Sequence, residues 1–151
     1  MKTISHAFLL VVAILVVSLA YARQETTLKK KDVPKAVLDA FAKSYPKATV
    51  KGYSKETANG KVVYEVASSE GKVGRDVTFN ADGTTVTVEE TLAFNDLPEA
   101  VRTAFTKEYP KAKSTKWEKV TEGSVTKYEA HMTSGKKSIE AVYNPDGSAA
   151  K

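Results

Sequence analysis

Glu129 and His131 come nearest, among the residues of this chain, to a group that could do chemistry. They stand two positions apart in a segment of strand-like alternation, so both side chains are expected on one strand face, with Glu140 on a neighbouring strand. A carboxylate and an imidazole can ligate a first-row metal, but a firm protein site takes three or four ligands. His131 is the only histidine after His6. We therefore expect a solvated polar face here, with no metal and no cofactor.

The sequence predicts no catalytic site. A serine–histidine–aspartate arrangement would have to use His131, and no nucleophile motif lies near that residue. Glu65 and Glu129 recur 64 positions apart, as a pair of catalytic carboxylates could, but pairing with lysine across strands is the favoured role. We expect a protein that is not an enzyme, and a hydrolase of an unfamiliar kind ranks last among the hypotheses.

An internal duplication accounts for the recurrence of these carboxylates. Residues 32–83 align with residues 96–147 at a constant offset of 64 and without a gap. Identities fall at both ends of the alignment and in its middle, so chance does not explain them. The clearest matches are Tyr-Pro-Lys-Ala at 45–48 and 109–112 and Asn-x-Asp-Gly at 80–83 and 144–147.

Each copy is expected to begin as a helix and to continue as strands. Pro34 suits a first helical turn, an apolar stripe that includes Val37 and Phe41 follows, and Tyr45-Pro46 ends the helix. Alternating segments separated by turn residues then predict an antiparallel meander. Alternation along its second strand places Glu65, Glu129 and His131 on the face away from the helix. The predicted fold is α+β, with two tandem helix-plus-antiparallel-meander units at residues 32–94 and 95–151 and no full last strand in the second unit.

The first 22 residues are expected to be a signal peptide. Lys2 precedes an apolar run at 7–20, and Ala20-Tyr21-Ala22 supplies the small residues that a signal peptidase requires. The run is shorter than the ~20 residues of a membrane-spanning helix, so a stable anchor is the disfavoured alternative. Residues 23–31 are polar and charged and are expected to form a flexible lead-in.

Composition and export restrict the partners. The formal net charge of +5 is mixed with acidic residues along the chain rather than gathered in one stripe, so neither charge nor export favours a nucleic-acid partner. The absence of cysteine excludes disulfides and thiolate metal sites. The sequence therefore predicts a periplasmic or secreted protein that is stabilised by an ordinary apolar core.

The repeated motif resembles a known family. The pattern [LV]-P-x-A-V-x-x-A-F-x-x-x-Y-P-x-A at 33–48 and 97–112, followed by a Y-E-containing strand and N-x-D-G, is similar to PepSY-like, beta-lactamase-inhibitor-like domains. The resemblance covers roughly residues 32–148 and implies tandem helix-plus-sheet units. It also implies a binding or inhibitory role toward an extracytoplasmic hydrolase, such as a peptidase or beta-lactamase. The shared motifs build the fold, so no inhibitory residue is carried over.

Two aromatic residues at equivalent positions complete the set of candidate binding residues. Tyr53 and Trp117 are flanked by lysines and would suit interface anchors if exposed. Packing over the edge of the core is the favoured alternative. The predicted partner-binding residues are Tyr53, Glu65, Trp117, Glu129 and His131. A module that binds a small ligand or an envelope component in a cleft between the units is the alternative function, and an open sheet edge predicts a weak homodimer.

Overall fold

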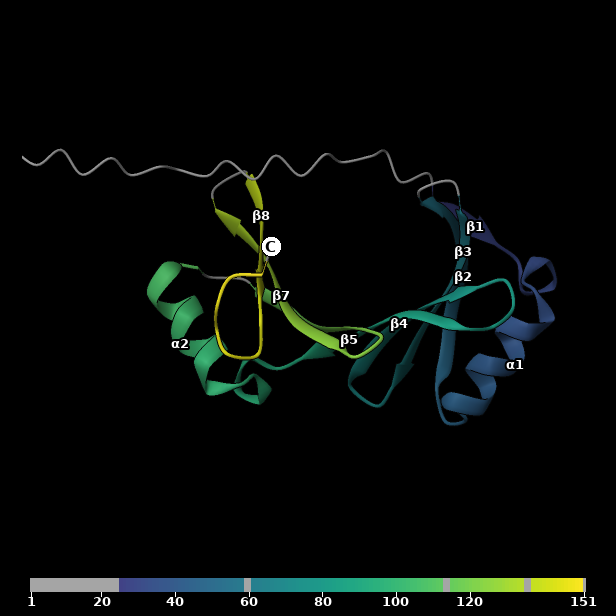
Figure 1. The fold of residues 1–151 in the computed structure, drawn as a ribbon, viewed down its shortest axis with the longest axis horizontal. Helices are drawn as coiled ribbons and strands as arrows, with labels where there is room; N and C mark the ends of the chain where they lie inside the picture. Colours follow the sequence, from purple (N-terminus) through teal and green to yellow (C-terminus); the bar gives the residue numbers. More distant parts are fainter. Residues whose placement is uncertain (1–24, 59–60, 113–114, 135–136, 151) are drawn as a thin grey trace, which may run out of the picture.

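The fold consists of one antiparallel sheet and two helices. The computed structural model describes residues 25–58, 61–112, 115–134 and 137–150. Within them, eight strands pair in the order of the sequence (Figure 1). The strands are β1 (Thr26–Leu28), β2 (Thr49–Ala58), β3 (Lys61–Glu70), β4 (Val73–Asn80), β5 (Thr85–Leu92), β6 (Thr115–Glu122), β7 (Val125–Ser134) and β8 (Lys137–Tyr143). The helices are α1 (Lys35–Ser44) and α2 (Glu99–Glu108). A 3-10 turn precedes each helix, η1 (Lys30–Asp32) before α1 and η2 (Phe94–Asp96) before α2.

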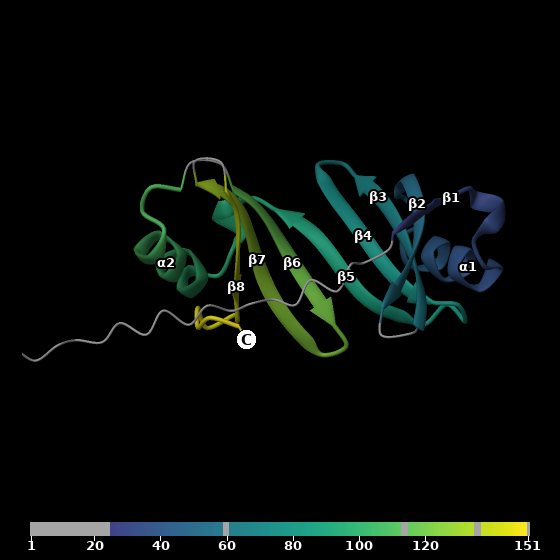
Figure 2. The ribbon, with the colours of Figure 1, turned by 90° about the horizontal axis from the view of Figure 1, so that it is seen from above.

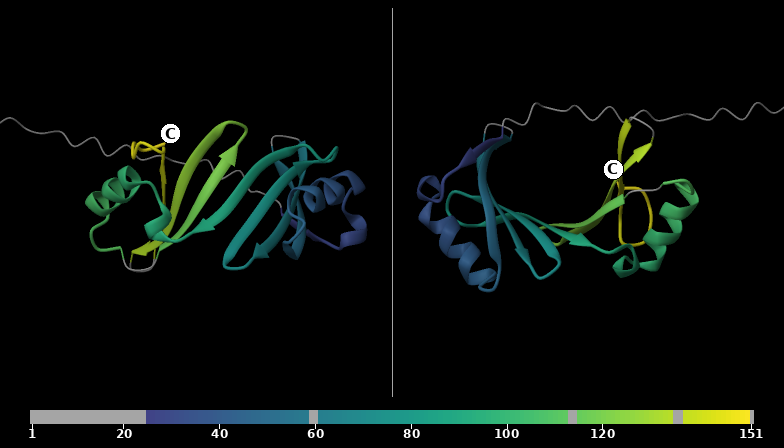
Figure 3. Two further views of the ribbon diagram at one scale, coloured as in Figure 1. Left: turned by 90° about the horizontal axis from the view of Figure 1, so that it is seen from below. Right: turned by 180° about the vertical axis from the view of Figure 1, so that it is seen from behind.

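The sheet bends into an arch. Its two ends, formed by β1–β3 and by β6–β8, rise from a middle part that contains β4 and β5 (Figure 1). Both helices lie on the outer side of the arch, one at each end, as the views from above and from behind also show (Figures 2 and 3). Neither of the two described α-helices therefore covers the inner side of the sheet.

The helices begin and end where the sequence predicts. Pro34 and Pro98 stand directly before the first residue of each helix, where a missing N–H costs no hydrogen bond. The backbone N–H groups of Tyr45 and Tyr109 make the last helical bonds, at 2.9 and 2.8 Å, and the prolines that follow them stop the helix. The predicted helix-plus-meander arrangement is thus confirmed for both copies.

Each helix covers a core of its own. In the first unit, Val37 and Phe41 of α1 pack against sheet residues that include Val66, Val77 and Phe79. The second core repeats this arrangement at the same offset of 64, with Trp117 at the position that Tyr53 has in the first unit. Its buried members are Leu97, Val101, Phe105, Trp117, Ala130, Met132 and Tyr143.

Strand β1 differs from the expected flexible lead-in at residues 23–31. Thr26–Leu28 pairs antiparallel with β2, because the partner strand lies remote in the sequence and offers a free edge. Leu28 is opposite Tyr53 just as Leu92 of β5 is opposite Trp117. β5 therefore closes the first unit and also opens the second, and it joins the two meanders into one sheet.

The second unit ends without a full last strand, as predicted. After β8, the turn at residues 144–147 leads back to a single bridge between Tyr143 and Ala149. The Ala150 N–H also donates to the Val142 carbonyl at 2.8 Å. The weak homodimer expected from a sheet edge remains a prediction.

Candidate functional site

The inner side of the arch, here called the open face, is the candidate site. Tyr53, Val66 and Val77 are opposite one another in the register and point toward α1. Since side chains alternate along a strand, their neighbours Ser54, Glu65 and Asp76 lie on the open face. The faces that the sequence predicts for Glu65, Glu129 and His131 are confirmed in this way.

Acidic side chains dominate the open face. Alternation and register assign eight carboxylates to it, compared with three lysines and one histidine among the described strand residues. Two of the acidic positions recur in both units at the offset of 64, Glu65 with Glu129 and Asp76 with Glu140. The carboxylates are Glu56, Glu65, Asp76, Glu89, Glu118, Glu122, Glu129 and Glu140.

Glu65 is the most perturbed of these carboxylates. Burial, and then repulsion by Asp76, Glu25, Glu56 and Glu89 in that order, raises the pKa of Glu65 from 4.5 to about 7. Burial, followed by repulsion from Glu118, also raises the pKa of Asp76, although Lys116 opposes the shift. The fold thus holds negative charges together at a cost, which is typical of a binding surface.

Ser54 adds an unsatisfied hydroxyl to this acidic cluster. The residue is 5% exposed and stands opposite Glu65 in the register. Its Oγ is buried and has no hydrogen-bond partner among the described residues. A buried polar group without a partner costs about 1–3 kcal/mol, so a group that supplies the missing bond would bind favourably.

In the second unit, cations compensate the equivalent carboxylates. Glu118 takes the place of Ser54. One of its carboxylate oxygens forms an ion pair with the Lys116 ammonium at 2.7 Å, and the other lies 3.0 Å from His131 Nε2. The contact between Glu118 and His131 is an ion pair when the imidazole is protonated, but its geometry is not that of a hydrogen bond. His131 Nε2 is 3.8 Å from Glu129, and its Nδ1 is 3.9 Å from Glu140. Within the described ranges, no three acidic or histidine side chains are arranged to hold a metal ion.

The first unit lacks these cations. Gly52 and Ala67 stand where the second unit has Lys116 and His131. The two units therefore differ in the charges that face Glu65 and its counterpart Glu129.

The Glu65→Gln substitution is expected to stabilise the protein above neutral pH. Between pH 4.5 and 7 the folded state binds more protons than the unfolded state, so stability falls as pH rises through this window. Glutamine does not ionise, and the variant should be about 1–2 kcal/mol more stable than the wild type at pH 8, after discounting the shift for solvent screening. Urea unfolding at pH 4 and pH 8 measures the difference. A variant that is no more stable than the wild type at pH 8 would show that the ionised carboxylate of Glu65 does not destabilise the folded state.

A protein-family model identifies the family of this chain. The model described as "Putative beta-lactamase-inhibitor-like, PepSY-like" matches residues 20–71 and 61–148. The chain belongs to this PepSY-like family. The two matches agree with the tandem repeat.

Solved structures share the PepSY-like fold of this chain. A protein from Bacteroides eggerthii described as "putative periplasmic" has a TM-score of 0.71 and 18% identity, covering 79% of this chain and 86% of that chain. A DUF2874 family protein from Bacteroides ovatus has a TM-score of 0.66 and 22% identity, with 79% and 85% covered. A BLIP-like protein from Bacteroides fragilis has a TM-score of 0.64 and 24% identity, with 79% and 84% covered. A comparison with curated proteins gave no match.

Trp117 is not an interface anchor in this PepSY-like chain. It is 2% exposed and packs in the second core, with its ring centroid 4.8 Å from that of Phe105. Tyr53 packs half-buried against the first core, also on the helix side of the sheet. The anchor interpretation is therefore wrong for Trp117, because the residue is buried. It lies inside the core rather than over its edge, whereas Tyr53 packs on the first core half-buried, close to the favoured alternative.

Sequence reasoning missed Ser54 and Glu118. Both lie on the first strand after a helix, whose faces the sequence did not settle. Glu56, Glu89 and Glu122 were not singled out either. None of these three residues has an acidic counterpart within the aligned repeats, so the duplication gave no signal for them.

A cavity of about 450 Å³ lies within the second unit. Aromatic residues of η2, α2 and β6 line it, among them Phe94, Phe105 and Trp117. It does not lie between the two units, where the small-ligand alternative expects a cleft. The predicted signal peptide at residues 1–22 lies outside the described residues. In the part of the chain that the structure describes, no helix is long and apolar enough to cross a membrane.

Proposed function

We propose that this PepSY-like protein is an exported binding module whose open face docks on a partner protein with a basic surface. One observation carries the proposal. Both helices lie on the outer side of a continuous eight-stranded sheet, and the other side carries eight carboxylates from strands of both units, Glu65 among them.

The dimensions of the open face suit such a partner. Eight strands at a spacing of ~4.8 Å span roughly 34 Å, and strands of about eight residues are roughly 27 Å long. The product, roughly 900 Å², matches the ~800 Å² that each partner buries in a standard protein–protein interface. A curved acidic sheet of this size would accept a convex basic surface.

The partner class that we propose is an extracytoplasmic hydrolase, a peptidase or a beta-lactamase. The description of the family as beta-lactamase-inhibitor-like supports a role in which the open face covers a cleft or docking surface of an enzyme. The predicted signal peptide and the periplasmic description of a structural neighbour support the location. Glu65, Glu129 and His131 would contact the partner.

Charge reversal on the open face is expected to abolish partner capture. The chain from Arg23 is immobilised, exposed to envelope and secreted proteins of its own source, and crosslinked, and the retained proteins are identified by mass spectrometry. A Glu65→Lys/Glu129→Lys variant places lysines against a basic partner, and the repulsion should weaken retention roughly 100-fold.

The matched control carries the same charge change on the helix side. Asp39→Lys and Glu99→Lys alter exposed residues of α1 and α2, and this variant should retain the partner. Inhibition of a retained hydrolase by the added chain would establish that the protein is an inhibitor of that enzyme. Retention by the open-face variant together with loss by the helix-side variant would contradict the proposal.

A further inference from the structure

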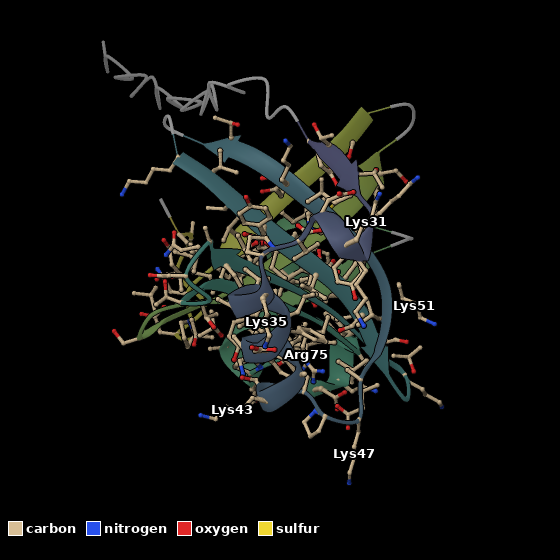
Figure 4. The ribbon with its side chains drawn as sticks, turned by 90° about the vertical axis from the view of Figure 1, so that its right-hand side faces the viewer. Lys31, Lys35, Lys43, Lys47, Lys51 and Arg75 are labelled. Carbon is tan, nitrogen blue, oxygen red and sulfur yellow. The ribbon has the colours of Figure 1, made fainter. Side chains whose placement is uncertain are left out.

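The outer side of the first unit carries a lysine patch. Five exposed lysines lie around α1 at the end of the molecule that Figure 4 views, and their side chains point outward. The patch consists of Lys31, Lys35, Lys43, Lys47 and Lys51, and Lys29 and Lys30 precede it in the chain. The segment 29–51 holds seven lysines and two aspartates, a formal charge of +5, which equals the net charge of the whole chain.

Arg75, which faces the same side, is not part of the patch. Its side chain is 10% exposed, and its Nε donates to Glu90 at 2.8 Å. The guanidinium also lies 4.3 Å from the centroid of the Tyr45 ring. These contacts neutralise and hold Arg75, whereas the five lysines are exposed, and the ion pair that Lys35 forms with Asp39 is exposed as well.

The second unit shows that the fold does not need the patch. The equivalent segment 93–115 forms the same turn and a helix of the same length, yet its formal charge is only +1, from four cations and three acids. Lys43 and Lys47 have counterparts in Lys107 and Lys111. The positions of Lys31, Lys35 and Lys51 are occupied there by Asn95, Glu99 and Thr115. The extra charge is therefore a property of the first unit and not of the repeat.

Lys35 is unfavourable for the helix that carries it. It is the first residue of α1, and α1 has no acidic residue in its first turn. A cation opposes the helix dipole at this end, and Glu99 of α2 satisfies the same rule that Lys35 breaks. The ion pair with Asp39 offsets little, because both side chains are exposed, at 86% and 63%. A local cost of this kind is expected where a residue serves a function.

We propose that the lysine patch binds an anionic lipid surface. All its cations are lysines, which act as point charges and do not provide the bidentate fork by which arginine recognises single phosphates or carboxylates. They spread over η1, α1, the turn that follows α1 and the start of β2. A cluster of four to eight basic residues in such an arrangement matches the diffuse charge of a membrane that contains anionic lipids.

This inference goes beyond the proposed function and does not depend on it. The patch lies on the outer side of the arch and the open face on its inner side (Figures 1 and 4). Lipid and protein partner can therefore be bound at the same time. A chain held by its lysine patch would present the open face at the surface of a membrane.

Vesicle binding tests the proposal. The chain from Arg23, which contains every described helix and strand, is sedimented at low ionic strength with phosphatidylcholine vesicles, with and without phosphatidylglycerol. We expect binding only to vesicles with phosphatidylglycerol. The Lys31→Asn/Lys35→Glu variant copies the residues of the second unit and changes the charge by three, so its binding should weaken by roughly 100-fold.

The control variant replaces two exposed lysines of the second unit in the same way, one by asparagine and one by glutamate. Lys107→Asn/Lys111→Glu also changes the charge by three and should bind vesicles like the wild type. Thermal unfolding verifies that both variants fold. Equal weakening by the two variants would show a net-charge effect and would overturn the patch. Binding of soluble heparin without binding to vesicles would overturn the lipid assignment in favour of an anionic polymer.

Discussion

Replacing Trp117 by alanine is expected to lower the free energy of unfolding by about 3–5 kcal/mol. The indole is 2% exposed, and its ring centroid lies 4.8 Å from Phe105 and 6.2 Å from Tyr143. Removing it would leave a large cavity beneath α2 in a structure whose total stability is about 5–15 kcal/mol. Urea unfolding followed by circular dichroism measures the loss.

Two further substitutions separate packing from other roles of Trp117. The Nε1 atom has no hydrogen-bond partner among the described residues, so Trp117→Phe loses volume but no bond and should cost only about 1–2 kcal/mol. Tyr53→Ala, at the equivalent position of the first unit, should cost less than Trp117→Ala, because Tyr53 is only half-buried. A Trp117→Phe variant that is as unstable as Trp117→Ala would contradict this account of its packing.

Replacing Gly83 by alanine is expected to cost about 2–4 kcal/mol, the second-largest effect. Gly83 has a φ of 84°, in the left-handed region that side chains rarely adopt. A Cβ atom there would lie 2.6 Å from the carbonyl oxygen of Ala36, so α1 would have to move away from the sheet. Gly147 has the same relation to Ala100 in the second unit, at 2.5 Å.

Gly71 provides the control for this prediction. Its φ of 60° is also left-handed, but no atom lies within 4 Å of the position of an added Cβ. Gly71→Ala should therefore cost only the backbone strain, about 1–2 kcal/mol. Thermal or urea unfolding of both variants compares them. Equal losses would show that the contact between the turn and α1 does not constrain the fold.

Local sequence patterns were sufficient to predict the helices, the turns and part of the open face. Prolines, apolar stripes and Asn-x-Asp-Gly act within a few residues, and the duplication supplied each pattern twice. Alternation along β3 and β7 then assigned Glu65, Glu129 and His131 to the face away from the helices. These predictions needed no knowledge of which strands pair.

Features that depend on pairing between distant segments could not be predicted. β1 forms only because β2 offers it an edge. In β2, a bulge between Val50 and Gly52 interrupts the alternation, so Val50 and Tyr53 both pack on the first core although they are three residues apart. The sequence therefore left the face of Tyr53 and Trp117 open and missed Ser54. The lysine patch was also missed, although the signal was present in the sequence: residues 29–51 alone carry a formal charge of +5, so the expectation of charge mixed evenly along the chain was wrong for this segment.

The measurement that tests the central claim most directly is lysine acetylation of the chain with its captured partner bound. Lys116 and Lys127 lie on the open face, and Lys107 and Lys111 lie on the helix side of the same unit. We expect the partner to protect Lys116 and Lys127 from acetylation and to leave Lys107 and Lys111 as reactive as in the free chain. Protection of Lys107 and Lys111 with full reactivity of Lys116 and Lys127 would contradict the claim that the open face is the binding surface.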